Sequence, residues 1–526
     1  MTFRPRPNQQ RVLDFAGGKM GVAAVPGSGK TRTLSALTAR LVAGSALRDD
    51  QEVLVVTLVN SAVDHFARQV GDFVSGYGLL PNVGYRVRTL HGLCNDIVRD
   101  RPGGLGLAEN FQILDDRDSA AILDDAVRVW LRTHPDAAAD YLLPDLDENR
   151  RIWLRDNQWP DLVSTTARVF IQQAKDMRLL PEQISYALDR FGEPLPLARM
   201  GYEIYANYQR GLNYRGAVDF QDLIRLALDV LEQDAIYLGR LRDRWPYILE
   251  DEAQDSSRLQ EQIIRLLTEG GNWVRVGDPN QAIYETFTTA RPESLWDFLD
   301  EPTVERRELP DSGRCAVPII DLANHLINWV ATAHPNPQIR ARQPLRPPLI
   351  KPTEPGDPQP NPPADQARIA LLDRDFTPEA EIGAVVDSLK RWLPDNPDAT
   401  CAVLVPRNKR GFDVANALKA LREPPIEYVE LLQSTTTTRE TAGALTHILN
   451  HLINPNAPGL LAQVYKVWRR EDREDETAAP QLEAVVKALR KLATIEDYIW
   501  PQLGRDWLAD DPTITELIEA APEIGE

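Results

Sequence analysis

Short apolar runs alternate with amphipathic stretches along the first part of the chain. The run Met20 to Val25 leads into a glycine-rich turn, and strand-like and helical patterns alternate from Val22 to about Asp64. Apolar runs return at Tyr247 to Leu249 and Trp273 to Val276. Short buried runs that alternate with helices are typical of parallel-sheet α/β units. The pattern therefore predicts an α/β fold.

Between these runs the pattern is helical. From about Asn95 to Tyr214, apolar residues recur three and four positions apart, as in Ser119 to Arg132 and Leu162 to Lys175. This spacing places apolar side chains on one face of a helix. We expect a helical insertion that interrupts the first α/β domain.

A proline-rich stretch follows. Residues Pro335 to Asp365 contain eleven prolines, too many for a helix or a central strand, so we expect an extended surface segment or linker. Three later runs predict strands of a second α/β domain: Arg368 to Leu372, Ala402 to Val405 and Ile426 to Leu431. Helices are expected between them, at Glu379 to Leu393 and Phe412 to Leu421, and mostly helices after about Ser434.

Composition narrows the class of protein. A chain of 526 residues suggests roughly three or four structural units. No apolar run approaches the ~18 residues that span a bilayer, and the start MTFRPRPNQQR has no apolar signal-peptide core, so we expect a cytoplasmic protein with no membrane partner. Three scattered cysteines without CxxC spacing argue against a disulfide framework and a zinc site.

The net charge of −19 is unfavourable for contacts to nucleic-acid phosphates. A local basic groove can nevertheless lie on an acidic protein. Three basic clusters are present: Arg306 with Arg307; Arg340, Arg342, Arg346 and Lys351; and Arg407, Lys409 and Arg410. Solvated surface is the simpler interpretation of each cluster alone.

The glycine-rich turn carries a first chemical motif. Residues Ala24 to Thr31 read AVPGSGKT, which fits a phosphate-binding loop except that Ala24 replaces the usual first glycine. Backbone N–H groups in such a loop, and the start of the next helix, hold phosphates. The loop residues expected to do so are Gly27, Ser28 and Gly29. Lys30 would reach the β and γ phosphates of a nucleoside triphosphate, and Thr31 would place its hydroxyl on Mg²⁺.

A second motif ends an apolar strand in carboxylates. In YILEDEAQD, Tyr247 to Asp255, Asp251 would hold Mg²⁺ directly or through water, and Glu252 would polarise the attacking water. A third motif is VRVGDPNQAIY, Val274 to Tyr284, in which Gln281 could bond the γ-phosphate or the attacking water. Tyr284 offers a ring on which a base could stack, although a lone tyrosine is more often a core residue.

The order of these motifs resembles the UvrD/Rep/PcrA group of superfamily-one helicases, over roughly residues 1 to 450. The resemblance implies phosphate-loop, RecA-like parallel-sheet motor domains with helical insertions. It also implies an ATP-driven motor that moves 3′ to 5′ along single-stranded DNA and opens duplex junctions. Gln9 stands at the position of the family's adenine-reading glutamine, with Gln10 as a close competitor, and Arg32 follows Thr31 as in the family's GKTR.

Two further segments resemble DNA-contacting motifs of that family. In VTLVNSAV, Thr57 and Asn60 match the family's VTFTNKAA, whereas Leu58 replaces the aromatic residue and Ser61 the lysine. In TLHGL, His91 is the candidate DNA contact or coupling residue, although a lone histidine is more often structural. The segment DFQDL, from Asp219, resembles the family's DFDDL, which returns the chain from the helical insertion.

The segment LPDSGRCAVPII, Leu309 to Ile320, takes the place of the family's NYRS motif. Arg314 matches the arginine that, in the family, reaches from the second motor domain to the γ-phosphate. Gly313 stands where the family has a tyrosine that stacks on adenine, so weaker base selectivity is expected. The simpler interpretation of Arg314 is an exposed surface arginine.

The family's KGLE-containing and TRA-containing motifs do not occur after Leu432. Either a second polypeptide supplies the missing motor motifs, or the chain is a truncated product or a fragment. We expect a division into residues 1–95 and 213–305 as a first RecA-like ATPase domain, 96–212 as a helical insertion, 306–432 as a partial second RecA-like domain with the proline-rich segment 335–365, and 433–526 as the start of a second helical insertion.

The sequence thus predicts an ATP-dependent DNA helicase. The rival interpretation is an ATP-binding and DNA-binding module that cannot unwind. An unrelated phosphate-loop ATPase would require both DEAQD and GDPNQAIY to be accidents.

Overall fold

The chain divides into two compact units, Met1–Ala370 and Leu371–Glu526. The computed structural model describes residues 3–490 apart from 45–46, 59, 142–145, 283–291, 367–368, 422–425, 432–435 and 471–477.

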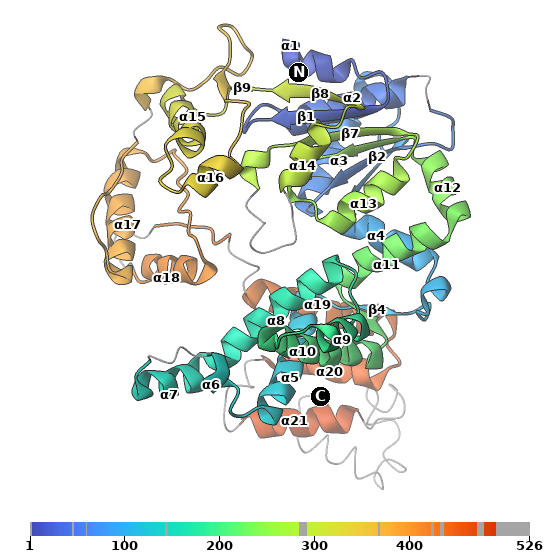
Figure 1. The fold of residues 1–526 in the computed structure, drawn as a ribbon, viewed down its shortest axis with the longest axis vertical. Coiled ribbons are helices and arrows are strands. Elements are labelled where there is room, and N and C mark those ends of the chain that lie inside the picture. Colours follow the sequence, from blue (N-terminus) through green and yellow to red (C-terminus); the bar gives the residue numbers. More distant parts are fainter. Residues whose placement is uncertain are drawn as a thin grey trace, which may run out of the picture. The chain divides into compact units, whose positions relative to one another are not determined.

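The first unit is built on a six-stranded parallel sheet in the order β3-β2-β6-β7-β1-β8 (Figure 1). The strands are β1 Lys19–Ala24, β2 Val53–Thr57, β3 Tyr85–Thr89, β6 Tyr247–Glu250, β7 Asn272–Gly277 and β8 Val304–Leu309. In β2, Val53 and Val55 enter one core while Leu54 and Val56 enter another. A parallel strand buried on both faces reads as one apolar run, which is why the sequence pattern located it. The predicted α/β fold is confirmed.

Helices cover both faces of this sheet. One core packs against α1 Pro7–Leu13, α2 Lys30–Ala43 and α3 Asn60–Gly76. The other packs against α4 Leu90–Asp100, α11 Phe220–Gln233, α12 Ala235–Arg244 and α13 Arg258–Leu267. A smaller cluster joins α14, Pro292–Leu299, to β1. Because all strands are parallel, the loops at their carboxyl ends lie along one edge of the sheet.

Strand β8 extends the sheet beyond the expected domain boundary. It pairs with β1 in parallel, with Ala24 opposite Leu309. The expected division between residues 305 and 306 therefore falls inside a strand. The sequence did not indicate this strand because its residues, VERREL, are mostly polar, as suits an exposed edge.

A helical insertion interrupts the sheet. It contains α5 Asp116–Thr133, α6 Ala138–Tyr141, α7 Glu148–Asn157, α8 Trp159–Asp176, α9 Pro181–Arg190 and α10 Pro196–Tyr214. A two-stranded parallel pair, β4 Gln112–Ile113 and β5 Ala217–Val218, joins its entry and exit. Its core is separate from those of the sheet and includes Trp130 and Tyr205.

A buried ion cluster links the insertion to the sheet-bearing part. Lys175, in the last turn of α8, is fully buried, and its Nζ lies 2.6 Å from Asp219 Oδ2 and 2.8 Å from Asp222 Oδ2. Tyr208 donates from its hydroxyl to Asp219 at 2.8 Å. Burial opposes the charge of Lys175, yet Asp222 and Asp219 hold the pKa of Lys175 above its usual value.

After β8 the chain stays in the first unit. It forms β9 Asp311–Ser312, α15 Val317–Thr332, α16 Pro337–Arg342 and β10 Lys351–Pro352, and β9 and β10 pair in parallel. The proline-rich segment therefore contains a short helix and a short strand, and it packs on the residues around Ser312. It is a fixed part of the first unit rather than a free linker.

The second unit contains α17 Pro378–Trp392, α18 Asn408–Lys419, α19 Thr436–Ile453, α20 Pro458–Trp468 and α21 Ala478–Leu489. The three strands predicted there were wrong. Within the described parts of those runs no strand is formed, and Leu371, Leu404 and Leu431 are 92%, 93% and 90% exposed. A β-strand requires a hydrogen-bonded neighbour, and these runs have none in the described chain.

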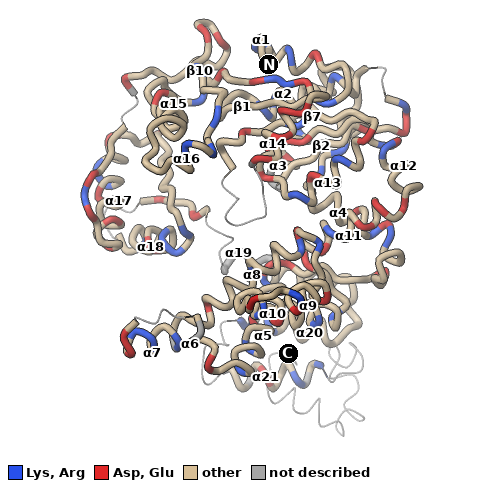
Figure 2. The backbone as a smooth tube through the Cα atoms, viewed as in Figure 1, with Lys and Arg blue, Asp and Glu red and all other residues tan. Residues whose placement is uncertain are grey.

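Acidic and basic residues are interspersed along the described chain (Figure 2). Members of the three basic clusters form ion pairs: Arg306 with Asp300 and Glu308, Arg307 with Glu305, Arg342 with Glu293, and Arg410 with Glu381. The clusters therefore carry less free positive charge than the sequence suggested. None of the helices that the structure describes is long and apolar enough to cross a membrane.

Candidate functional site

The glycine-rich turn connects β1 to α2 at the carboxyl edge of the sheet. Gly27 and Gly29 have φ values of 75° and 81°, which favour glycine. A side chain at Gly27 would also lie 2.5 Å from Arg314 Cβ and 2.6 Å from Ser312 Oγ. Helix α2 begins at Lys30, so its first N–H groups face the turn. The local sequence therefore forms a turn whose backbone geometry suits the binding of an anion at the start of α2.

The carboxylates of the second motif meet this loop. Lys30 Nζ lies 2.8 Å from Glu252 Oε2, and Thr31 Oγ1 donates to Asp251 Oδ2 at 3.2 Å. Both carboxylates follow β6 directly, and Glu252 has a φ of 55°. A non-glycine residue in that conformation is strained, and such strain gathers at functional sites.

The two carboxylates differ in their affinity for protons. Burial, and then the charge of Glu252, raises the pKa of Asp251 to about 6. Burial also opposes the charge of Glu252, but Lys30 beside it holds the pKa of Glu252 below its usual value. At neutral pH, Glu252 is thus a fully ionised acceptor. Ionised Asp251 destabilises the folded protein, because its charge is buried beside that of Glu252, and a nearby cation would reduce this free-energy cost.

Gln254 connects the second and third motifs, and Gln281 is held within the third. Gln254 donates from Nε2 to Glu252 at 2.9 Å, and its Oε1 accepts from the backbone N–H of Asp278 at 3.0 Å. Gln281 donates from Nε2 to Asp278 Oδ2 at 2.7 Å. The predicted site residue Gln281 is therefore held in place by the acid that precedes it.

One cavity of about 270 Å³ brings most of the predicted nucleotide residues together. Its lining residues are Pro26, Gly27, Gly29, Lys30, Thr31, Arg32, Gln69, Glu252, Gln281 and Arg314. Arg314 also contributes to lowering the pKa of Glu252. The sequence placed Arg314 in a second domain, whereas it lies in the same compact unit as the loop.

Gln9, and not Gln10, contacts the loop. Gln9 is buried and donates from Nε2 to the backbone oxygen of Ser28 at 2.9 Å, while its Oε1 accepts from Arg6 N–H at 2.9 Å. Gln10 instead donates to Asp14 on the exposed side of α1. Arg32 is exposed on α2, with its guanidinium 5.2 Å from the ring centre of Phe3.

A neighbouring cavity of about 330 Å³ contains one predicted DNA residue. Thr57, at the end of β2, lines it together with Thr31, Asp251 and Gln281. Thr57 is only 2% exposed, so just its surface within the cavity is accessible. Asn60 begins α3, but its side chain is outside the described residues, as is all of Tyr284.

His91 lies away from both cavities, where α4 meets α11. Its ring packs edge-on against Phe220, with ring centres 5.8 Å apart. Burial lowers the pKa of His91, and Asp116 on α5 opposes this shift. His91 is therefore neutral at pH 7 and lies next to the helical insertion.

A family model described as the UvrD/REP helicase N-terminal domain matches residues 6–302. The chain belongs to this family. Relatives include the ATP-dependent DNA helicase Rep of Escherichia coli, 28% identical over 62% of this chain and 43% of the relative. DNA helicase II of Escherichia coli is 29% identical over 61% and 39%. The probable DNA helicase II homolog of Rickettsia conorii is 28% identical over 61% and 44%. The chain matches less than half the length of each relative.

Some residues that line or support the candidate site were not among those predicted from the sequence. Gln69 on α3 lines the cavity and lies 3.3 Å from Ser35 Oγ, and no pattern in the sequence marked it. Gln254 lies inside the motif DEAQD, so its spacing could have indicated a role. Asn361 and Asp357 also contact segments of the site from far along the chain.

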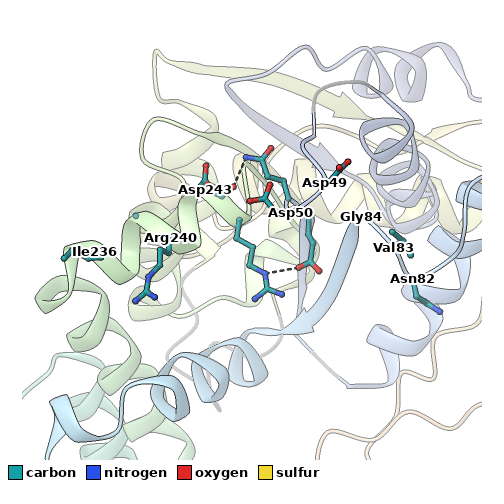
Figure 3. A pocket seen from close by; sticks show the side chains of 12 residues that line it. Asp49, Asp50, Asn82, Val83, Gly84, Ile236, Arg240 and Asp243 are labelled. Atoms are coloured by element: carbon teal, nitrogen blue, oxygen red, sulfur yellow. Dashed lines mark hydrogen bonds and ion pairs between the residues drawn. The ribbon is translucent and has the colours of Figure 1, made fainter.

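A larger cavity, about 810 Å³, lies at the opposite edge of the sheet (Figure 3). Glu52, Gly84 and Arg244 line it, and they precede β2, β3 and β6. Gln51 donates to the backbone oxygen of Asp243 at 2.8 Å, and Arg244 lies 3.3 Å from Glu52. None of the predicted site residues borders this cavity, so cavity volume alone does not lead to the residues that the sequence motifs predict.

Proposed function

We propose that this chain is the ATP-hydrolysing N-terminal part of a DNA helicase that moves 3′ to 5′ along single-stranded DNA and unwinds duplex junctions. The observation that carries the proposal is the cavity in which Lys30, Glu252, Gln281 and Arg314 meet at the phosphate loop. A loop lysine, a carboxylate after a strand and an arginine are the groups that phosphoryl transfer requires. The family and the names of the relatives support DNA as the substrate.

The residues present fit ATP with Mg²⁺. Ser28 Oγ is buried in the loop without a hydrogen-bond partner among the described residues, which suits a loop that binds phosphate oxygens. Thr31 and Asp251 place a hydroxyl and a carboxylate oxygen 3.2 Å apart, and oxygen ligands are those that Mg²⁺ prefers. When bound, Mg²⁺ neutralises charge on the phosphates.

Each remaining side chain has a role in this scheme. Lys30 exchanges its contact with Glu252 for the β and γ phosphates. Glu252, ionised and tied to Gln254, accepts a proton from the attacking water. Gln281 orients the water or the γ-phosphate, and Arg314 stabilises the charge that develops on the transferred phosphoryl group. Gln9 supports the loop from behind.

We place single-stranded DNA across the carboxyl edge of the sheet. Thr57 and Asn60 would contact the strand near the ATP site, and Tyr284 would stack on a base. His91, neutral and packed on Phe220, would contact DNA or transmit its binding to the helical insertion. The roles of Asn60 and Tyr284 rest on the family resemblance, whereas that of Thr57 is also supported by its place in the cavity beside the phosphate loop.

The test is ATP hydrolysis by the purified chain with and without single-stranded DNA at low salt. We expect stimulation by DNA, and a loss of at least ~100-fold in Lys30→Ala. Lys419→Ala, an exposed lysine on α18, is the matched control and should retain wild-type activity. Absence of any DNA stimulation would contradict the helicase proposal.

The second candidate is an ATP-binding and DNA-binding module without unwinding activity. It is favoured by the exposed apolar runs around Leu371, Leu404 and Leu431, which do not form the sheet of a second motor domain in the described chain. A second polypeptide that pairs with these runs would convert the module into a motor. Strand displacement on a tailed duplex separates the two candidates, because the module predicts ATP binding without displacement.

A further inference from the structure

A segment that lies outside the motifs in the sequence contacts three parts of the candidate site in the folded chain. We call residues 346–361 the strap. At its start, the Arg346 N–H donates to Asn280 Oδ1 at 3.0 Å, and Asn280 Nδ2 donates back to the Arg346 carbonyl at 2.8 Å. Asn280 directly precedes Gln281, so this reciprocal pair fixes the turn that carries Gln281.

The end of the strap binds the loop that carries Arg314. Asn361 Nδ2 donates to the Ser312 carbonyl at 2.6 Å and to the Cys315 carbonyl at 2.8 Å. These carbonyls lie on either side of Arg314. Asn361 Oδ1 accepts from the N–H of Thr353 at 2.8 Å, which orients the amide. One side chain therefore clamps both flanks of the arginine.

The middle of the strap reaches the segment that supports the phosphate loop. Asp357 Oδ2 lies 2.7 Å from Arg6 Nε, and the two side chains are 9% and 10% exposed. Arg6 also donates from Nη1 to the Asp311 carbonyl at 3.0 Å, and its backbone N–H holds Gln9. Asp357 is thus connected through Arg6 to both Gln9 and the arginine loop.

The strap and the loop that carries Arg314 pack closely against each other at Gly313. A Cβ added at Gly313 would lie 2.0 Å from the carbonyl oxygen of Gln359. Even alanine would therefore push the strap away, because a backbone atom cannot yield as a flexible side chain can. Because Gly313 has no side chain, the strap can pack directly against the loop that carries Arg314.

We propose that Asn361 is a positioning residue for Arg314, and that the strap holds the arginine loop at the geometry that ATP hydrolysis requires. This inference rests on the proposed function, since Arg314 must act on the phosphate for its position to matter. It predicts that disturbing the strap lowers kcat without abolishing nucleotide binding, because Lys30 and the loop glycines are left in place.

The decisive variant is Asn361→Asp, which keeps the shape and the acceptor for Thr353 but replaces the N–H donors with a carboxylate that repels both carbonyls. We expect kcat to fall by at least about tenfold, with nucleotide affinity changed by less than about threefold. Asn328→Asp makes the same change at an exposed position of α15 and should leave kcat unaltered. Wild-type kcat in Asn361→Asp would overturn the proposal.

A double mutant separates positioning from general structural damage. If Asn361 acts through Arg314, then Asn361→Asp combined with Arg314→Ala should be no slower than Arg314→Ala alone. Multiplying losses would overturn the proposal. If Arg314→Ala itself has wild-type kcat, it is the proposed role of Arg314 that fails.

Gly313→Ala provides an independent variant if Asn361→Asp does not fold. It displaces the strap through the Gln359 contact and removes no hydrogen-bonding group. The same loss of kcat with retained nucleotide affinity is expected. Full activity in a folded Gly313→Ala protein would overturn the inference.

Discussion

The ammonium group of Lys30 lies 2.8 Å from the carboxylate of Glu252, so the phosphate loop and the end of β6 are joined by an ion pair. The pair is only partly shielded, since the Glu252 side chain is 38% exposed. Its partners can therefore separate when phosphates compete for the lysine. The ion pair holds the Lys30 ammonium and the Glu252 carboxylate at the positions that the proposed reaction requires.

Replacing Glu252 by Gln should separate binding from hydrolysis. The amide keeps the size of the side chain and still accepts from Gln254, but it cannot take a proton from water. We expect kcat for ATP to fall by ~10²–10⁴ with little loss of nucleotide affinity. Steady-state hydrolysis and equilibrium binding of a fluorescent ATP analogue give the two quantities. A parallel loss of both would contradict the assigned role.

Asp251 should make the protein less stable as the pH rises through about 6. Its pKa is raised from 3.8 to about 6, so the folded protein holds a proton that the unfolded chain has already lost between these values. The stabilising contribution is full below pH ~4 and is lost through pH ~6. Asp255, with its pKa also raised to about 6, adds a change of the same sign.

Asp251→Asn removes this cost. We expect its free energy of unfolding at pH 8 to exceed that of the wild type by on the order of 1–3 kcal/mol, with a smaller difference at pH 4.5. Urea unfolding at the two pH values measures it. Equal stability at pH 8 would show that Asp251 is ionised without penalty.

Lys175→Met should destabilise the junction between the helical insertion and α11. The change leaves Asp219 buried without Lys175, and it leaves Asp222 with the longer ion pair to Arg225 at 3.5 Å; removing one partner of a buried ion pair costs ~3–5 kcal/mol in comparable cases. Thermal unfolding should show a markedly lower Tm. Adding Asp219→Asn and Asp222→Asn to Lys175→Met removes the two buried negative charges and should restore part of the lost Tm. If Tm does not rise in the triple variant, buried charge is not the cause of the destabilisation.

Base selectivity should be weak. No aromatic side chain follows Ser312, because Gly313 stands there against the Gln359 carbonyl, and the amide of Gln9 is engaged by Ser28 and Arg6. We expect kcat/KM for GTP to lie within about tenfold of that for ATP. We also expect Gln9→Ala to affect both nucleotides equally, through the loop. A strong preference for ATP that Gln9→Ala removes would show direct reading of adenine.

The sequence predicted the parts of the site that are local in the chain. The loop from Gly27 to Thr31 and the acids after β6 are contiguous motifs, and their burial pattern fixes them to one edge of a parallel sheet. The choice between Gln9 and Gln10 required the structure, because only the rotation of α1 decides which amide faces Ser28.

The contacts of Asn361, Asp357 and Gln69 could not be predicted from a single chain. Asn361 binds the Ser312 carbonyl from 49 positions away, and Asp357 pairs with Arg6 across 351 positions. Nothing local in a proline-rich segment encodes such partners. The strand predicted at Ala402 to Val405 is wrong because a local pattern does not supply a pairing partner. The run is apolar, as a strand would be, but the described chain has no neighbouring strand to pair with it.

Strand β8 connects the loop that carries Arg314 to the same sheet as the phosphate loop. It lies hydrogen-bonded to β1, the Leu309 carbonyl accepts from Val25 N–H at 3.1 Å, and the chain reaches Arg314 shortly afterwards. Lys30 and Arg314, the two cations of the proposed reaction, therefore lie in segments that follow adjacent strands of one compact unit. Under the proposed function, ATP would therefore bind between loops of a single compact unit, so no movement of Leu371–Glu526 is needed to bring Arg314 to the phosphates.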